Sequence, residues 1–286
     1  MHHAVNKGIG RREFCRGAAA GIASMVLAPS FAASGRPVRT PLMLDAKRMA
    51  VWDGPGVRTT FFVKGCPLRC IWCHNPESVD PARQVARFQH LCQHCAKCTM
   101  DEATCPTRAL KFYGREWTTD ALVAKALEDK PFYDRTGGGV TLSGGEPLFF
   151  WEWAAEFLGR IKAAGMRTCL DTSLYAPPAA IEALLPVVDM WLPDYKAHDE
   201  ELHRKYTGVS NGVIRRNLER LVAAKAKLEV RCLVVPKCTD GADIAARHAY
   251  LNSLGIGEDR IVDLEYLDYA RSKYRALGIE DTMPPT

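Results

Sequence analysis

Three cysteines lie close together in the stretch FVKGCPLRCIWCHNPES, at Cys66, Cys70 and Cys73. Thiolates at this spacing can ligate one iron–sulfur cluster, whereas disulfide partners usually lie on separate elements. A cubane cluster has four irons, so three protein ligands leave one iron free to chelate a small molecule through an amine and a carboxylate. The alternative is a zinc site with His74 as fourth ligand, although zinc sites usually draw two ligand pairs from separated positions.

A second cysteine group follows. Its members are Cys92, Cys95, Cys98 and Cys105. With Pro106 after the last cysteine, the group resembles the ferredoxin run C-x2-C-x2-C-x3-C-P, except for three extra residues before the fourth cysteine. We expect a second [4Fe–4S] cluster in a cysteine-rich insert at residues 80–115. The alternative is a structural metal knot, with zinc as one option because His90 and His94 lie nearby.

The composition fits a globular protein with bound metal. The chain has 286 residues, 47% of them hydrophobic, which is ample for a buried core. The net charge is +5, and Lys and Arg are interleaved with Asp and Glu, so nucleic-acid binding is not expected. The remaining cysteines lack cluster spacing and are predicted to be small buried hydrophobes. They are Cys15, Cys169, Cys232 and Cys238.

Residues 1–40 form a leader and linker. Arg11 and Arg12 precede an Ala- and Gly-rich apolar run that resembles a twin-arginine export signal. This run is too short and too rich in Gly for a stable membrane span. The alternatives are a disordered leader or a later start of the protein, at Met43 or Met49.

Beyond the leader the chain alternates strand-like and helix-like segments. Strands are expected at 59–64, 138–147, 166–173, 187–196, 227–236 and 260–267. Helices are expected at 118–133, 151–164, 178–185, 211–227 and 241–254. About six strands in this order predict an α/β fold, an incomplete (β/α)6 TIM-like barrel over residues 41–286. In such folds the chemistry lies where the strands end, and the cysteine loop, SGGEP, DTS and DYK all follow strands.

The segment WDGPGVRTTFFVKGCPLRCIWCHNPES resembles radical S-adenosylmethionine (SAM) enzymes, and among them the activating enzymes of glycyl radical enzymes. The resemblance continues through FYDRTGGGVTLSGGEPL, DYKAHDEELHRKYTGVSNGVIRRNL and SKYRALG, and covers about residues 42–280. It implies a partial barrel of the radical SAM type with a small cysteine-rich, ferredoxin-like insert. Such an insert is absent from the short activases of pyruvate formate-lyase, which favours activases of eliminases acting on diols, choline or aryl acids.

The resemblance also implies a set of binding residues. Cys66, Cys70 and Cys73 hold the catalytic cluster, and SAM binds its open iron. The residues implied around SAM are Trp72, Cys73, His74, Gly144, Gly145, Glu146, Pro147, Asp171, Thr172, Asp194 and Lys196. The backbone around Trp72 and His74 lies near the adenine, and GGEP meets the methionine amino group. The last four residues line the carboxylate and ribose, around a monovalent cation, and no side chain beyond the cluster and SAM is expected to be catalytic.

The implied function is an anaerobic oxidoreductase. One electron from the reduced cluster cleaves SAM to methionine and a 5′-deoxyadenosyl radical, which abstracts a glycine α-hydrogen from a partner glycyl radical enzyme. A flavodoxin or ferredoxin supplies the electron, and the activase is expected to be a monomer. Because SAM and the reductant are cytoplasmic, we expect cytoplasmic function, with the periplasm as the alternative through the leader. The alternative functions are a radical SAM enzyme acting on a small molecule or peptide, and a catalytically silent iron–sulfur electron carrier.

Several positions depart from the family pattern. Leu174 stands where Gly usually follows the DTS-like triplet, and Lys237 replaces the Gly of a VPG turn, which predicts an unstrained backbone there. Leu267 replaces a His that usually contacts SAM, and Ala270 replaces a Gly. The departures lie in the C-terminal third, whereas the cluster half fits the pattern.

Overall fold

The computed structural model describes residues 40–283 of the chain. The predicted leader therefore lies, except for Thr40, outside the described residues, as does Cys15. Within residues 40–283 no helix is long and apolar enough to cross a membrane.

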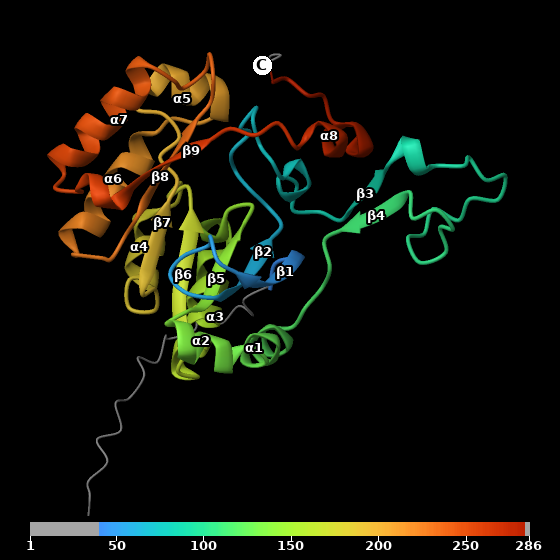
Figure 1. Ribbon diagram of the computed structural model, residues 1–286, viewed down its shortest axis with the longest axis horizontal. Coiled ribbons are helices and arrows are strands. Elements are labelled where there is room, and N and C mark those ends of the chain that lie inside the picture. The colour runs from blue at the N-terminus through green and yellow to red at the C-terminus, as the bar shows by residue number, and fades with distance from the viewer. Residues whose placement is uncertain (1–39, 284–286) are drawn as a thin grey trace, which may run out of the picture. The chain divides into compact units, whose positions relative to one another are not determined.

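A five-stranded sheet in the order β1-β2-β5-β6-β7 forms the centre of the fold (Figure 1). The strands of the structure are β1 (Met43–Ala50), β2 (Arg58–Val63), β3 (Gln84–Arg87), β4 (Leu110–Tyr113), β5 (Gly139–Gly144), β6 (Arg167–Thr172), β7 (Met190–Pro193), β8 (Val230–Val234) and β9 (Ile261–Glu265). In this sheet β1 is antiparallel to β2, and the other neighbours are parallel. The strand β1 at the edge was not predicted.

The parallel order continues from β7 into β8 and β9. Trp191 N donates to Lys227 O at 2.9 Å, and Tyr195 N donates to Arg231 O at 2.8 Å, which places β8 beside β7. The strands β8 and β9 are themselves parallel. All the strands expected from the alternation are therefore present among the described residues and follow one another in parallel. The α/β fold is confirmed, and the parallel arrangement is consistent with a partial TIM-like barrel.

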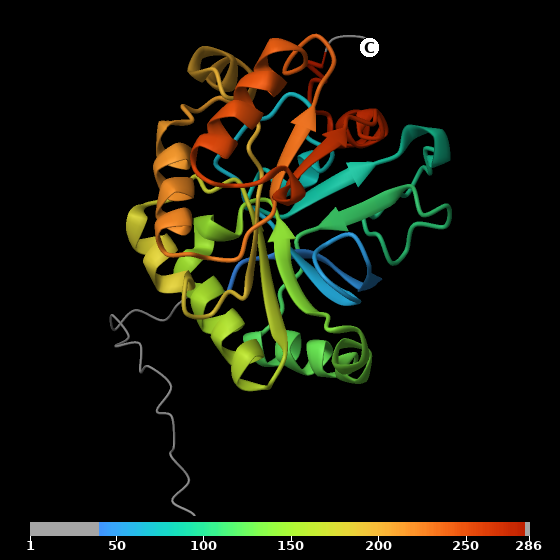
Figure 2. The same ribbon diagram turned by 60° about the vertical axis from the view of Figure 1, so that its left-hand side comes forward.

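Helices cover one side of the strands. The helices are α1 (Thr119–Leu127), α2 (Lys130–Thr136), α3 (Trp151–Ala163), α4 (Pro178–Leu184), α5 (Glu200–Thr207), α6 (Gly212–Ala223), α7 (Ala242–Ser253) and α8 (Arg271–Leu277), with short 3-10 turns η1 (Pro76–Ser78), η2 (Gln89–Leu91), η3 (Pro147–Phe150) and η4 (Glu258–Arg260). In Figure 2, α3, α4, α6 and α7 lie on one side of the strands and the β3–β4 hairpin on the other.

The segment 118–133 forms two helices rather than one, because Pro131 has no amide hydrogen and is tolerated only in a first helical turn.

The core lies between the sheet and these helices. Phe61 of β2 meets Phe157 of α3 edge to face, with ring centroids 5.5 Å apart, and Trp153 stacks on Phe157 at 5.2 Å. Aromatic pairs of this kind bury large apolar areas and fix the angle of the helix on the sheet. Cys169, Cys232 and Cys238 are buried, as predicted for small hydrophobes.

The strands β3 and β4 form an antiparallel hairpin that lies apart from the central sheet (Figure 1). The segment between them, 88–109, contains η2 and otherwise turns and irregular backbone. The second cysteine group lies on this segment. The hairpin occupies the place of the expected insert at 80–115, and the ferredoxin-like character of the insert stays a prediction.

Candidate metal and cofactor site

A cavity of about 280 Å³ lies where the strands end and brings most of the predicted site together. The predicted residues that line it are Cys66, Cys70, Trp72, Cys73, His74, Gly144, Gly145, Asp171, Thr172, Asp194 and Lys196. The lining residues that sequence reasoning missed are Asp53, Phe62, Leu68, Asn75, Ser78, Ser143, Ser173, Leu233 and Leu264. Many of the missed residues directly adjoin a predicted motif, so proximity in sequence was the available signal. Leu233 and Leu264 come from β8 and β9 and carried no such signal.

The cysteine loop is closed at its base and held at its tip. Gly65 N donates to Ser78 O at 2.7 Å and Cys66 N to Val79 O at 3.0 Å, which joins the two ends of the loop. At the tip, Arg69 N donates to Thr207 O at the end of α5, at 2.7 Å. The backbone that carries the three thiols is therefore fixed from two sides.

Burial keeps the three thiols protonated in the metal-free protein. It raises the pKa of Cys66 and of Cys70 to about 12, and it also raises the pKa of Cys73. A metal cluster takes thiolates, so binding it here releases protons. Among residues 40–283, no three His, Cys, Asp or Glu side chains are grouped so as to hold a single metal ion.

Two ring nitrogens in the cavity wall lack a partner. Trp72 Nε1 and His74 Nε2 are buried and have no hydrogen-bond partner among the described residues. Buried polar groups are normally paired, so these nitrogens suit a polar ligand in the cavity. The rings themselves are held by Tyr206 against Trp72, with centroids 5.8 Å apart, and by Tyr266 against His74, at 5.5 Å. The donor set of thiols and unpaired nitrogens fits an iron–sulfur cluster with a nucleoside-bearing ligand.

The turn after β5 approaches the neighbouring backbone so closely that only glycine fits. Gly144 has φ of +117°, and a Cβ added there would lie 2.4 Å from Val63 N. A Cβ added to Gly145 would lie 2.3 Å from Gly65 O. Both glycines thus press the turn against the start of the cysteine loop.

The carboxylate of Glu146 points into the wall rather than the cavity. Its residue is 1% exposed, and it accepts hydrogen bonds from Leu148 N at 2.9 Å, Thr172 Oγ1 at 2.6 Å and Ser173 N at 2.7 Å, as well as from Ser173 Oγ. Burial raises its pKa against the effect of these donors. Glu146 and Pro147 do not line the cavity, so the expected contact between the Glu146 side chain and an ammonium has no geometric support; Gly144 and Gly145 remain as the lining part of GGEP.

Two carboxylates and two cations meet at the ends of β6, β7 and β8. Asp171 Oδ2 accepts from Ser143 Oγ at 2.7 Å and lies 3.6 Å from Arg231. Lys196 Nζ donates to Asp194 Oδ2 at 2.9 Å. Burial, with the nearby charge of Asp194, raises the pKa of Asp171 to about 6. Although burial opposes the charge of Lys196, Asp194 keeps the pKa of this ammonium above its usual value. Carboxylates that repel each other in this way suit a further cation.

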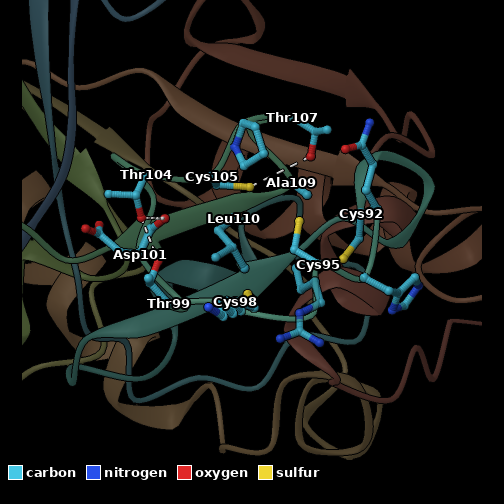
Figure 3. A pocket seen from close by; sticks show the side chains of 15 residues that line it. Cys92, Cys95, Cys98, Thr99, Asp101, Thr104, Cys105, Thr107, Ala109 and Leu110 are labelled. Carbon is cyan, nitrogen blue, oxygen red and sulfur yellow. Dashed lines mark hydrogen bonds between the residues drawn. The ribbon is translucent and has the colours of Figure 1, made fainter.

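The second cysteine group lines a separate cavity of about 290 Å³ on the hairpin. Figure 3 shows Cys92, Cys95, Cys98 and Cys105 around Leu110. Cys95 and Cys98 are exposed, and all four are free thiols. The pKa of Cys105 is lowered, because slight burial is outweighed by backbone groups around Leu110 and by the Thr107 hydroxyl.

The departures from the family pattern have different structural outcomes. Leu174 has φ of +60° and Lys237 has φ of +63°, so both keep a conformation that glycine favours. The expectation of an unstrained backbone at Lys237 is wrong; its N–H donates to Asp240 Oδ2 at 2.9 Å, which holds the turn. Leu267 is exposed and does not line the cavity, so it does not take the place of the family histidine.

Comparisons with known proteins find a matching family, related sequences and a related fold. The radical SAM superfamily matches residues 60–246. The chain is 36% identical to the (2S)-3-sulfopropanediol dehydratase activating enzyme of Klebsiella oxytoca, over 83% of this chain and 86% of that protein. It is 32% identical to the benzylsuccinate synthase activating enzyme of Thauera aromatica, over 84% of this chain and 83% of that protein. The solved structure of Streptococcus suis SuiB bound to precursor peptide SuiA is similar in fold alone, with a TM-score of 0.51 and 13% identity, over 76% of this chain and 40% of that chain.

Proposed function

Because the chain belongs to the radical SAM superfamily and, within it, to the glycyl radical enzyme activating enzymes, we propose that it binds SAM in the cavity bounded by the cysteine loop. The enzyme uses an iron–sulfur cluster and SAM to generate a 5′-deoxyadenosyl radical, and so activates a partner glycyl radical enzyme by abstracting a glycine α-hydrogen. The observation that carries the proposal is the meeting of three thiols and two unpaired ring nitrogens in one cavity.

Cys66, Cys70 and Cys73 are the ligands of the catalytic cluster, which supplies one low-potential electron when bound. The chain contributes a loop whose backbone is fixed at its base and at its tip, and this loop carries the three thiols. Because burial protonates these thiols in the metal-free protein, loading the site must displace their protons.

Different residues of the cavity wall bind different parts of SAM. The backbone around Trp72 and His74 would lie near the adenine, in a part of the cavity wall where two ring nitrogens lack a partner. Gly144 and Gly145, whose close approach to the backbone of Val63 and Gly65 leaves no room for a Cβ, would lie against the amino group. Glu146 is a positioning residue that acts through these glycines. Its carboxylate accepts hydrogen bonds from Thr172 and Ser173 at the end of β6.

Asp171, Thr172, Asp194 and Lys196 form the part of the cavity that takes the carboxylate and ribose of SAM. Lys196 would offer a positive charge to the carboxylate, and Asp171 and Asp194 would attract a monovalent cation.

The partner is a glycyl radical enzyme of the eliminating type. The relative from Klebsiella is the activating enzyme of a sulfopropanediol dehydratase, and the hairpin of this chain carries a second group of four cysteines around one cavity. A second iron–sulfur cluster would be held by Cys92, Cys95, Cys98 and Cys105. This cluster would receive electrons from a flavodoxin or ferredoxin.

The enzyme works as a monomer in the cytoplasm, where SAM and reductant are available.

The test is anaerobic reconstitution with iron and sulfide, followed by dithionite and SAM. The wild type should release 5′-deoxyadenosine, variants with Ala at Cys66, Cys70 or Cys73 should release none, and Cys92→Ala should still release it. Absence of release from the loaded wild type would leave only an electron carrier. Adding a glycyl radical dehydratase should then give a glycyl radical signal; release without this signal would favour a small-molecule or peptide substrate.

A further inference from the structure

The base of the cysteine loop and the root of the hairpin meet at a buried lysine. Lys64, at the end of β2 and two residues before Cys66, is 0% exposed. Its Nζ donates to Glu77 O at 2.6 Å and to Gln84 Oε1 at 2.7 Å. Gln84 begins β3, and a Cβ added to Gly114, just after β4, would lie 3.0 Å from Lys64 Cδ. Lys64 therefore contacts both ends of the hairpin.

A second lysine reaches the same place from α8. Lys273 Nζ donates to His74 O at 3.0 Å, to Asn75 Oδ1 at 2.9 Å and to Glu77 Oε1 at 2.7 Å. An ammonium has three donors, so these acceptors use all of them. Two of the acceptors follow Cys73 directly, and none of them is a thiol. Lys273 thus fixes the backbone that leaves the cluster ligands.

Glu77 links the two lysines. Its backbone carbonyl accepts a hydrogen bond from Lys64, and its carboxylate accepts one from Lys273. The Glu77 side chain is 7% exposed. Within the described residues, the other carboxylate oxygen has no hydrogen-bond partner. Removing Lys273 would therefore leave a buried carboxylate without its hydrogen-bond donor, which is unfavourable.

The helix α8 holds the hairpin as well as the loop. Ala276 forms a buried cluster with Ala86 of β3 and Tyr113 of β4, and Leu277 packs against it. The seven-residue helix α8 thus contacts two segments. It hydrogen-bonds to the three-cysteine loop through Lys273 and packs on the hairpin through Ala276 and Leu277.

We propose that Lys64, Glu77 and Lys273 form a junction that positions the three-cysteine loop relative to the hairpin carrying the second cysteine group. They are positioning residues, because they contact the backbone and side chains beside the thiols rather than a reacting atom. The junction sets the orientation of His74 in the cavity wall, and so the shape that the cavity presents to SAM. This second consequence rests on the proposed function, whereas the first does not.

The test compares Lys273→Met with Lys125→Met in the full chain. Lys125 is a matched control, since it is 28% exposed, against 29% for Lys273, and donates to one carboxylate, that of Glu128, at 2.8 Å. In the metal-free protein, hydrogen exchange of the Ser78 and Val79 amides, which donate to Asn75 O and Pro76 O, should become about tenfold faster in Lys273→Met, the effect of losing about one charged hydrogen bond, and should not change in Lys125→Met. In the reconstituted protein, the Kd for SAM should rise about tenfold at unchanged iron content.

The outcomes separate the junction from the proposed function. If the wild type does not bind SAM, the proposed function fails, and exchange of the Ser78 and Val79 amides still decides the junction. Unchanged exchange of these amides in a folded Lys273→Met protein overturns the junction. Should Lys273→Met not fold, Glu77→Gln retains an acceptor for Lys273 and decides instead: a smaller rise in exchange supports the junction, and wild-type exchange rates contradict it.

Discussion

Thr172 Oγ1 donates a 2.6 Å hydrogen bond to the carboxylate of Glu146, which joins the turn after β5 to the end of β6. Ser173 N donates to the same carboxylate at 2.7 Å. A buried carboxylate satisfied by neighbouring donors is stable where an unpaired one would not be. The pair thus fixes the Gly144–Gly145 turn at the cavity wall, although Glu146 itself lies behind it.

Glu146→Gln should lower the free energy of unfolding by about 1–3 kcal/mol, because the amide NH2 faces donors that it cannot accept from. SAM binding should weaken as well, since the glycine turn loses its support. Urea unfolding of the metal-free protein checks the first effect. Glu156→Gln, on the exposed face of α3, is the control and should leave stability unchanged. Equal stability of Glu146→Gln and wild type would contradict the hydrogen-bonding role.

The thiols should differ in reactivity when no metal is bound. Burial raises the pKa of Cys66 and Cys70 to about 12, whereas the pKa of Cys105 is lowered. Because the thiolate is the nucleophile, iodoacetamide at pH 8 should label Cys105 well before Cys66 and Cys70. Labelling of Cys66 and Cys70 should rise about tenfold per pH unit while they remain mostly protonated. Mass spectrometry of the peptides reads this order, and early labelling of Cys66 would contradict the raised pKa of its thiol.

The carboxylate of Asp171, which lines the cavity, should lower the free energy of unfolding when it is charged. Its pKa is raised from 3.8 to about 6 by burial and by Asp194, so the folded state disfavours the charged form. The resulting loss of stability begins near pH 4, grows as the pH rises to about 6 and persists above it. In urea unfolding at pH 8, the free energy of unfolding of Asp171→Asn should therefore exceed that of wild type by on the order of 1 kcal/mol. At pH 4 the two proteins should have the same free energy of unfolding.

The same variant should bind SAM and a monovalent cation more weakly, since it removes a carboxylate from the cavity. The exposed Asp134 provides a control, because Asp134→Asn should change neither property. A loss of stability in Asp171→Asn at pH 8 would mean that the ion pair with Arg231, 3.6 Å away, outweighs burial.

The parallel strands β2 and β5 to β9 could be predicted from the sequence, because the buried ones among them are short apolar runs followed by polar motifs. The runs around Phe61, Val140 and Leu170 are buried in the structure for this reason. The hairpin strands β3 and β4 have four residues each and little periodicity, and α8 has seven residues, so no pattern indicated them.

Site residues that depend on contacts distant in sequence could not be predicted. The role of Glu146 depends on donors from Thr172 and Ser173, which only the pairing of β5 with β6 brings near. Lys273 meets Asn75 across 198 positions of the chain. Lys237 misled the prediction in another way: the residue type disfavours a positive φ, but the turn through Asp240 imposes it.

The most direct test of the central claim is the electron paramagnetic resonance spectrum of the reduced, reconstituted protein before and after SAM is added. In a variant with alanine at all four cysteines of the second group (Cys92, Cys95, Cys98 and Cys105), which leaves the first group alone, the cluster signal should change when SAM occupies the iron left open by Cys66, Cys70 and Cys73. A signal that SAM leaves unaltered, or a site that holds zinc in place of iron, would contradict the account.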